Sequence, residues 1–190
     1  MNFASWRQTR INTCGPACLM VALSELGRSD ISEETEMRIW RRVRHMLVLG
    51  STPAALASYA RARGARAELL VYGPRPADFP LQVSGLHLFL QRYLLYAYRL
   101  GARAAARNGV PVVRASGGGE ILDRITIRPE TRAIVLIVDR DRILHFLLVR
   151  KNGPNLMVMD PDSGANIPFS RPAFLALEKA SGVGYCVLVS

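Results

Sequence analysis

The chain has 190 residues, of which 49% are hydrophobic and 21% are charged, a composition that excludes disordered and fibrous proteins. This length lets one domain bury a full core without disulfides or structural metal ions. The formal net charge is +10, and all but two of the 25 basic residues are arginines. Because the arginines are scattered along the chain, the charge does not favour nucleic-acid binding, although it leaves an acidic partner open.

No segment of the sequence predicts a membrane span or a secretory signal. The first ten residues contain no apolar stretch of the kind that a signal peptide needs. The most apolar segment, "GLHLFLQRYLLYAYRLG" from Gly85, is shorter than the roughly 20 residues of a membrane helix and contains Arg92. Three cysteines, an odd number, indicate reduced thiols. We expect a bacterial cytoplasmic protein, with export by a specialised secretion system left open, and the sequence indicates no oligomeric state.

The first third of the chain predicts helices. Pro16 is expected at a first helical position, where a missing N–H is tolerated, so Cys14 falls at the helix N-terminus. The run that follows is apolar on almost every face and ends at Gly27, which indicates a buried central helix. A second helix is expected over 31–46, capped by Ser32. A third starts at Thr52 and Pro53 and ends at Gly64, and a strand follows over 66–72. The expected apolar face of the second helix consists of Met37, Trp40, Val43 and Leu47.

The middle of the chain is harder to interpret. A proline-rich loop over 72–80 precedes an aromatic and leucine-rich helix over 85–107. Its apolar residues cover much of the circumference, so this helix either packs in the core or forms a wall of a substrate cleft or a docking surface. Gly117, Gly118 and Gly119 predict a mobile loop.

The last third changes to short apolar segments rich in β-branched residues, at 132–139, 143–151 and 156–160. The polar turns between them predict an antiparallel meander. A short helix over 171–180 and a last strand over 184–190 complete the chain. Helices followed by strands predict an α+β fold rather than a doubly wound sheet.

Four residues have a spacing that suggests acyl-transfer chemistry. Cys14 stands at a helix N-terminus, which stabilises a thiolate. His145 lies in one predicted strand and Asp160 ends the next, so a hairpin would bring them together as part of a Cys/His/Asp triad. Gln8, six residues before Cys14, could donate to an oxyanion together with the Cys14 N–H.

The stretch "Q-x5-CGPACLMVAL", with "HFLLV" and "DPDSG" downstream, resembles the papain-like cysteine peptidases, and most closely the bacteriocin-processing C39 peptidases. The resemblance covers residues 8–72 and 132–190. It implies a helical N-terminal part with a central helix that starts at the nucleophile, followed by a C-terminal antiparallel sheet. It also implies that Cys14 is the nucleophile, His145 the general base and acid, Asp160 the orienting residue and Gln8 the oxyanion donor.

We therefore predict a single papain-like domain over 1–190, with an insertion at 73–131. The predicted function is a cysteine peptidase that cleaves a peptide or isopeptide bond of a peptide or protein substrate without a metal or cofactor. Two alternatives stay open. One is an acyltransferase or transpeptidase with the same triad, and the other is a non-catalytic module that binds an acidic partner.

The remaining cysteines and histidines have simpler interpretations. Cys18 and Cys186 lie in apolar runs and are expected in the core, and His45 and His87 are expected to be structural or solvent-facing. A zinc site made of Cys14, Cys18 and a histidine is not favoured, because a single CxxxC has no second paired cluster.

Overall fold

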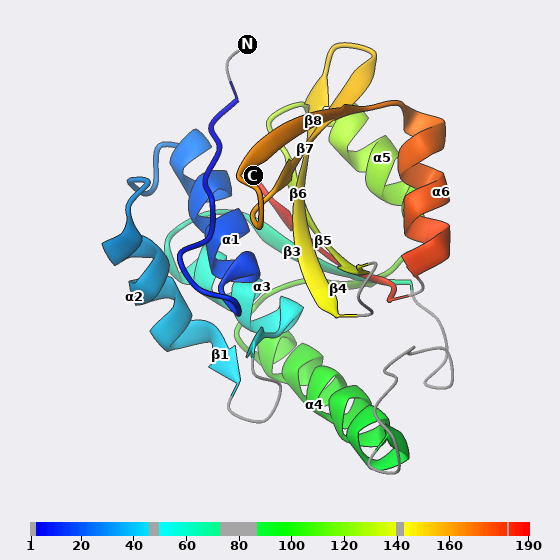
Figure 1. The fold of residues 1–190 in the computed structure, drawn as a ribbon. Helices are drawn as coiled ribbons and strands as arrows, with labels where there is room; N and C mark the ends of the chain where they lie inside the picture. The colour runs from blue at the N-terminus through cyan, green and yellow to red at the C-terminus, as the bar shows by residue number, and fades with distance from the viewer. Residues whose placement is uncertain (1–2, 46–49, 73–86, 140–142, 182) are drawn as a thin grey trace.

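A computed structural model describes residues 3–45, 50–72, 87–139, 143–181 and 183–190. In this part of the chain a mixed sheet is the middle layer of the molecule (Figure 1). The helices are α1 (Cys14–Glu25), α2 (Glu33–Val43), α3 (Pro53–Ala62), α4 (His87–Arg107), α5 (Gly118–Ile127) and α6 (Arg171–Ser181). The strands are β1 (Arg44–His45), β2 (Gly50–Ser51), β3 (Ala67–Val71), β4 (Val112–Arg114), β5 (Arg132–Val138), β6 (Leu144–Asn152), β7 (Asn155–Asp160), β8 (Ala165–Phe169) and β9 (Tyr185–Val189).

The described strands form a seven-stranded sheet in the order β4-β3-β9-β5-β6-β7-β8, and β1 and β2 form a separate two-stranded pair. Every pairing in the large sheet is antiparallel except that of β3 with β4. The predicted meander corresponds to β5, β6 and β7, which confirms the α+β class. β8 then continues the antiparallel order to the edge of the sheet.

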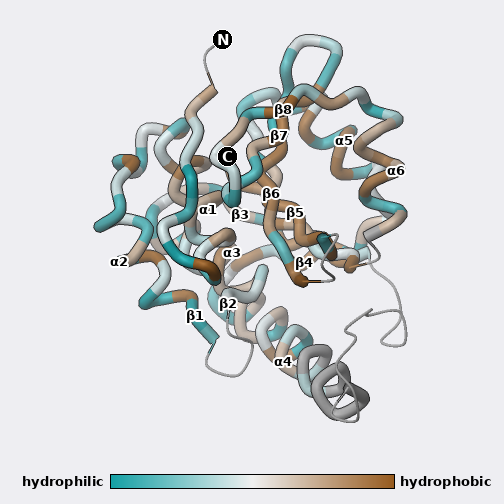
Figure 2. The backbone as a smooth tube through the Cα atoms, in the orientation of Figure 1, coloured by the Kyte–Doolittle hydropathy of each residue, from teal (hydrophilic) through white to brown (hydrophobic). Residues whose placement is uncertain are grey.

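Two apolar layers cover the two faces of the sheet (Figure 2). On one face α1, α2 and α3 pack with the sheet around residues such as Leu19, Leu56 and Leu148. On the other face α5 and α6 cover the sheet through Leu122 and Phe174. α1 is buried from Gly15 to Leu23, so it is the central helix that the sequence predicts.

Three predictions about helices need correction. α2 ends at Val43, and His45 belongs to β1. The buried residues of α2 are Thr35, Glu36, Ile39 and Val43. The predicted apolar face of this helix is therefore wrong by about one position, because Glu36 occupies a core position. Leu47 lies outside the described residues. Pro16 is the third residue of α1 rather than the first, where it also replaces an N–H that has no partner within the helix.

The predicted glycine loop is wrong, because Gly118 and Gly119 begin α5. A Cβ atom on Gly118 would lie 2.6 Å from Glu178 Oε2, so this glycine lets α5 approach α6 closely. Gly117 has a φ of 149° and precedes the helix. These glycines therefore serve backbone geometry and packing.

The long helix is confirmed over His87–Arg107, and the proline-rich loop lies largely outside the described residues. Ala97, Tyr98 and Ala105 of α4 are buried, whereas Tyr96 is 60% exposed and Leu100 is 42% exposed. One face of the helix therefore packs in the core and another faces solvent. β4 joins the main sheet beside β3, so this later part of the 73–131 segment is integrated in the fold.

Candidate active site

Cys14 is the first residue of α1 and is partly exposed, whereas the next nine residues are buried or nearly so. The preceding residue, Thr13, donates its hydroxyl to the Arg10 carbonyl at 2.8 Å and makes no side-chain cap on the helix. Thr13 therefore provides no side-chain acceptor for the first N–H groups of α1. Such an end of a helix is a favourable environment for a thiolate or an oxyanion.

Gly15 brings the start of α1 against the sheet. A Cβ atom at this position would lie 2.3 Å from Ser51 Oγ and 3.0 Å from the Phe146 ring, distances that leave no room for a side chain. One turn later the Cys18 thiol donates to the Phe146 carbonyl at 3.5 Å. Since Phe146 directly follows His145, these two contacts fix the start of α1 relative to the histidine.

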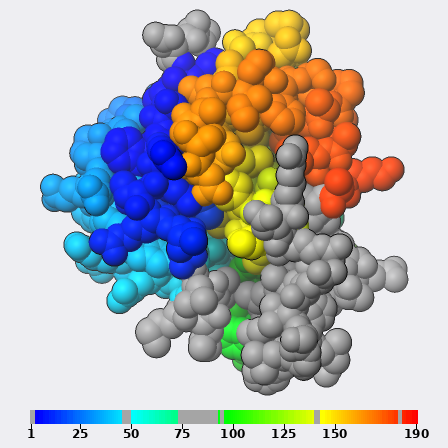
Figure 3. Space-filling view, in the orientation of Figure 1, coloured from blue at the N-terminus to red at the C-terminus, as the bar shows by residue number. Residues whose placement is uncertain are grey.

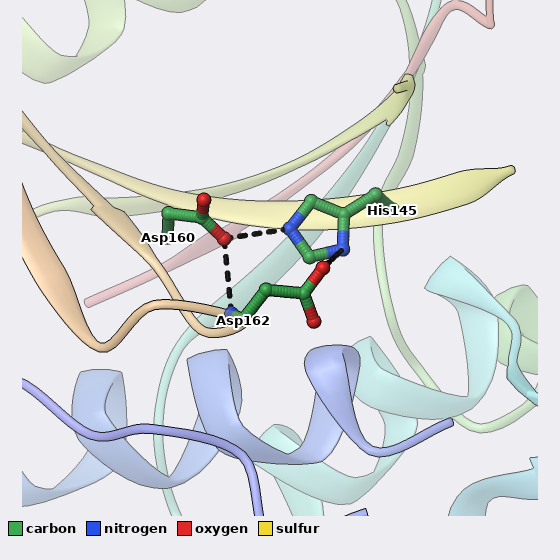
Figure 4. Close-up of side chains that lie close together, drawn as sticks. All are labelled: His145, Asp160 and Asp162. Carbon is green, nitrogen blue, oxygen red and sulfur yellow. Dashed lines mark hydrogen bonds and ion pairs between the residues drawn. The ribbon is translucent and has the colours of Figure 1, made fainter. Parts of the chain in front are cut away.

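His145, Asp160 and Asp162 point toward one another at the ends of β6 and β7 (Figure 4). His145 Nε2 lies 2.9 Å from Asp160 Oδ1, which also accepts the Asp162 backbone N–H at 3.0 Å. The contact between His145 and Asp160 that the hairpin predicts is thus present. Asp162 lies at the opposite side of the ring, with Oδ2 3.8 Å from Nδ1.

The charges around His145 favour its protonated form. Burial lowers the pKa of His145, but hydrogen bonding and charge from Cys14, the Asp160 hydrogen bond and the Asp162 charge outweigh burial and raise it to about 9. Cys14 is therefore a neighbour that stabilises the charged form of the imidazole. By contrast, burial raises the pKa of the Cys18 thiol, which keeps that cysteine neutral.

Gln8 lies in an extended N-terminal segment that contacts the turn after Asp160. Its backbone N–H donates to the Pro161 carbonyl at 2.7 Å. Its side-chain Oε1 is buried, and in the described part of the chain it accepts no hydrogen bond. The side-chain carbonyl of Gln8 thus has unused acceptor capacity close to the loop that holds the two aspartates.

A buried carboxylate of α2 holds the residues on both sides of Gln8. Glu36 is fully buried, accepts from the Trp6 indole N–H at 2.6 Å and accepts from the Thr9 backbone N–H at 3.1 Å. Gln8 is therefore fixed between α2 and the β7–β8 turn. In Figure 3 the N-terminal residues and the β7–β8 region meet along the front of the molecule, beside the start of β6.

His145, Asp160 and Asp162 have the chemistry of metal ligands. One ligand atom from each lies within 4.8 Å of the other two, a spacing that could admit a cation. His145 Nε2 and Asp160 Oδ1 are already bonded to each other, so a cation would have to displace this hydrogen bond.

Three residues of this region were not singled out in the sequence. Asp162 lies within the "DPDSG" motif, and Gly15 lies within "CGPAC", so the motifs include both without indicating their contacts. Glu36 is an acidic residue in the charged first turn of α2, where burial is not expected. Only its position three residues before the core residue Ile39 suggests the buried face.

A central helix with a cysteine at its start, packed on an antiparallel sheet with a His–Asp pair, defines the papain-like cysteine peptidase fold. The structure aligns with the crystal structure of the peptidase domain of Streptococcus ComA, a bifunctional ABC transporter involved in a quorum-sensing pathway. The TM-score is 0.55 at 13% identity, over 100% of this chain and 98% of that domain. The chain belongs to the Peptidase_C39 like family, which matches residues 3–166.

The family assignment confirms the resemblance on which the sequence analysis depends. No curated protein matches the sequence. Among the described helices, none combines the length and the apolar character that crossing a membrane requires.

Proposed function

We propose that this protein is a cysteine peptidase that cleaves a peptide or isopeptide bond through an acyl-enzyme on Cys14. The main support is the geometry around His145. Asp160 occupies Nε2 at 2.9 Å, which leaves Nδ1 to exchange a proton with Cys14. This division of the two ring nitrogens gives the imidazole a fixed orientation on one side and a reactive partner on the other.

The proposed reaction begins with the Cys14 thiolate and the His145 imidazolium. The sulfur attacks the substrate carbonyl carbon, and the developing negative charge on oxygen is stabilised by the Cys14 N–H and the Gln8 amide. His145 then donates its Nδ1 proton to the leaving amine, which departs as the C–N bond breaks and a thioester forms. Water attacks the thioester as His145 accepts its proton, and the carboxylic acid product leaves Cys14.

Asp160 would act through His145 and not on the substrate. Its carboxylate accepts the Nε2–H, holds the ring plane and stabilises the imidazolium. The remaining exposure of Asp160 and Asp162 side chains, 31% and 54%, is consistent with a site that a substrate can approach.

The test uses p-nitrophenyl acetate as an acylating probe and iodoacetamide as an alkylating probe, with the modified residue mapped by mass spectrometry. We expect a rapid burst of nitrophenol together with an acetyl group on Cys14, followed by slower deacylation. His145→Ala should abolish the burst. Adding an amine or thiol acceptor during deacylation distinguishes hydrolysis from transfer. Only in a transferase should the acceptor accelerate deacylation and be converted to the transfer product.

Cys186→Ala is the matched control, since Cys186 is also buried but lies in the apolar layer on the other face of the sheet. This variant should keep both the burst and the Cys14 modification. A protein whose Cys14 reacts no faster than a free thiol, with or without His145, would not be a thiol enzyme.

A further inference from the structure

The corner of the sheet next to α4 contains an open hollow of about 540 Å³. This size lies within the range of pockets that bind small ligands or a few side chains. α4 forms one wall, and the ends of β3, β4 and β9 form the other. The polar lining consists of Tyr72, Tyr185, Arg99, Arg103 and Arg114.

Three cationic side chains converge on this hollow. Arg99 and Arg103 are four residues apart on α4 and thus share one face of the helix, and Arg114 ends β4. Among the described residues, no acidic side chain lines the hollow. Within the described ranges, none of these three arginines forms an ion pair with a carboxylate, since the pairs found there involve other residues.

A second hollow of about 360 Å³, on the α5 side of the sheet, provides an internal comparison. It also contains three arginines, but Arg124 bonds Glu68 at 2.6 Å and Glu120 at 3.1 Å. Arg128 lies 3.8 Å from the same Glu68 carboxylate. Two of the three arginines of this hollow therefore have carboxylate partners within the protein, whereas those of the α4 hollow retain their capacity to bind an anion.

The α4 hollow is close to the candidate active site on the same side of the sheet. Tyr185 lines it and packs edge-to-face on Tyr98 at 5.1 Å, and the apolar cluster that contains both tyrosines also contacts Cys14. In the sheet, Tyr185 pairs with Leu136, and Leu136 pairs with Phe146, the neighbour of His145. Two strand spacings, about 10 Å, separate β9 from β6, and four, about 19 Å, separate β4 from β6, so an extended peptide covers the interval in about three to six residues.

We propose that the hollow formed by Arg99, Arg103 and Arg114 is a subsite that binds acidic side chains of the peptide substrate, a few residues from the bond that is cleaved. Guanidinium groups bind carboxylates through paired, charge-assisted hydrogen bonds, and three of them in one hollow suit a segment with more than one acidic residue. This inference rests on the proposed function, because it takes the occupant to be the substrate of Cys14.

The first experiment measures binding alone, with the Cys14→Ala protein and a fluorescein-labelled hexaglutamate peptide at physiological ionic strength. Replacing Arg99, Arg103 and Arg114 by glutamine should weaken binding by at least about tenfold, since each lost charged hydrogen bond contributes that much or more. The control replaces Arg41, Arg42 and Arg63 by glutamine. These three arginines are exposed, and their replacement removes the same amount of positive charge. An equal loss of peptide affinity in the control would show that binding depends only on the net charge of the protein, which would overturn the proposal.

The second experiment links the hollow to Cys14. Hexaglutamate should slow alkylation of Cys14 by iodoacetamide in the wild type and should not slow it in the Arg99/Arg103/Arg114 variant. If hexaglutamate bound at the three arginines but did not slow the alkylation of Cys14, the hollow would be a separate anion site, and the proposal that it is a substrate subsite would be overturned. Tighter binding of a single-stranded oligonucleotide than of hexaglutamate to the same arginines would also overturn it. If Cys14 were unreactive while the peptide still bound, the proposed function would fail and the anion site would stand.

Discussion

Two buried cations on one strand, Arg150 and His145 of β6, have opposite surroundings. Arg150 is fully enclosed by the Ala4 carbonyl at 2.8 Å, the Glu25 carboxylate at 2.5 Å, the Asn166 side chain and the Phe3 ring. These partners tie the N-terminal segment and the end of α1 to the sheet. At the other end of the strand, Asp160 lies 2.9 Å from one nitrogen of His145, Asp162 lies 3.8 Å from the other, and Cys14 further stabilises the charged ring.

The difference separates a charge that maintains the fold from one that is available for chemistry. The partners of Arg150 are themselves held, since Glu25 also accepts from Arg132 at 2.5 Å and Asn166 donates to the Phe3 carbonyl at 3.0 Å. A network of this kind leaves no position for a substrate. Around His145, by contrast, Asp160, Asp162 and Cys14 are all partly exposed, so a substrate can approach them.

The largest predicted effect on stability is that of Arg150→Met. Removing one partner of a buried ion pair typically costs about 3–5 kcal/mol, and we expect a loss near the lower end of this range, because Arg132 still pairs with Glu25. Urea unfolding followed by circular dichroism should show this loss, whereas His145→Ala should cost less than about 1 kcal/mol. Equal losses of unfolding free energy in the two variants would show that His145 contributes to the fold as much as Arg150 does.

The next effect concerns reactivity. At pH 6.5 an unassisted thiol with a pKa of about 8.5 is only about 1% ionised, so His145→Ala should slow iodoacetamide alkylation of Cys14 by up to about 100-fold. Arg150→Met, studied where it is still folded, should leave the alkylation rate within about threefold of the wild type. The rate is measured by quenching and mass mapping of Cys14. A similar fall in both variants would mean that alkylation reports folding and not the imidazolium.

A smaller effect is expected at Glu36, which we treat as a positioning residue for Gln8. Glu36→Gln keeps the side-chain shape but weakens its bonds to Trp6 and Thr9, so acetylation of Cys14 by p-nitrophenyl acetate should slow by about tenfold. Loss of the oxyanion donor itself in Gln8→Ala should cost about 100-fold. Alkylation by iodoacetamide, which forms no oxyanion, should stay unchanged in both variants.

The double variant provides the check on this assignment. If Glu36 acts through Gln8, the Glu36→Gln change should have no further effect on acetylation once Gln8 is alanine. Independent, multiplying effects, or a parallel fall in alkylation, would show that Glu36 only stabilises the fold.

The sequence predicted the elements whose signals are local. The apolar run after Cys14 indicates the central helix, and the polar turn between the apolar segments before and after Asn152 indicates the hairpin that brings His145 to Asp160. Both predictions are confirmed in the structure. The catalytic roles of Cys14, His145, Asp160 and Gln8 stay predictions, because their geometry supports a reaction that only the experiments above can establish.

The elements that the sequence did not predict depend on contacts between distant segments. β4 has only three residues and forms because β3 offers a parallel edge. Gly118 of α5 looks like part of a flexible loop until the close approach of Glu178 explains it. Glu36 looks like a solvent-facing acid until Trp6 and Thr9, about thirty residues earlier, donate to it. The local pattern of apolar and polar residues does not indicate these contacts between distant segments.

The smallest and most specific prediction concerns the two carboxylates on either side of His145. The ring should keep its proton through neutral pH and lose it as the pH rises through about 9, which an NMR titration of the Cε1 proton can follow. Each change that removes a stabilising neighbour should lower the pKa of His145. The largest decrease is expected for Cys14→Ala, then Asp160→Asn, and the smallest for Asp162→Asn, because Asp162 lies 3.8 Å from Nδ1 and is the most exposed of the neighbours.

The order of these three shifts tests the proposed use of the two ring nitrogens. If Nδ1 is paired mainly with Cys14, Asp162→Asn leaves the alkylation of Cys14 largely intact while the pKa of His145 falls slightly. If Asp162 were instead the main partner of Nδ1, its removal would lower the pKa of His145 more than Cys14→Ala does. The imidazolium would then be committed to a carboxylate on each side, as Arg150 is committed to its partners, and the site would be structural.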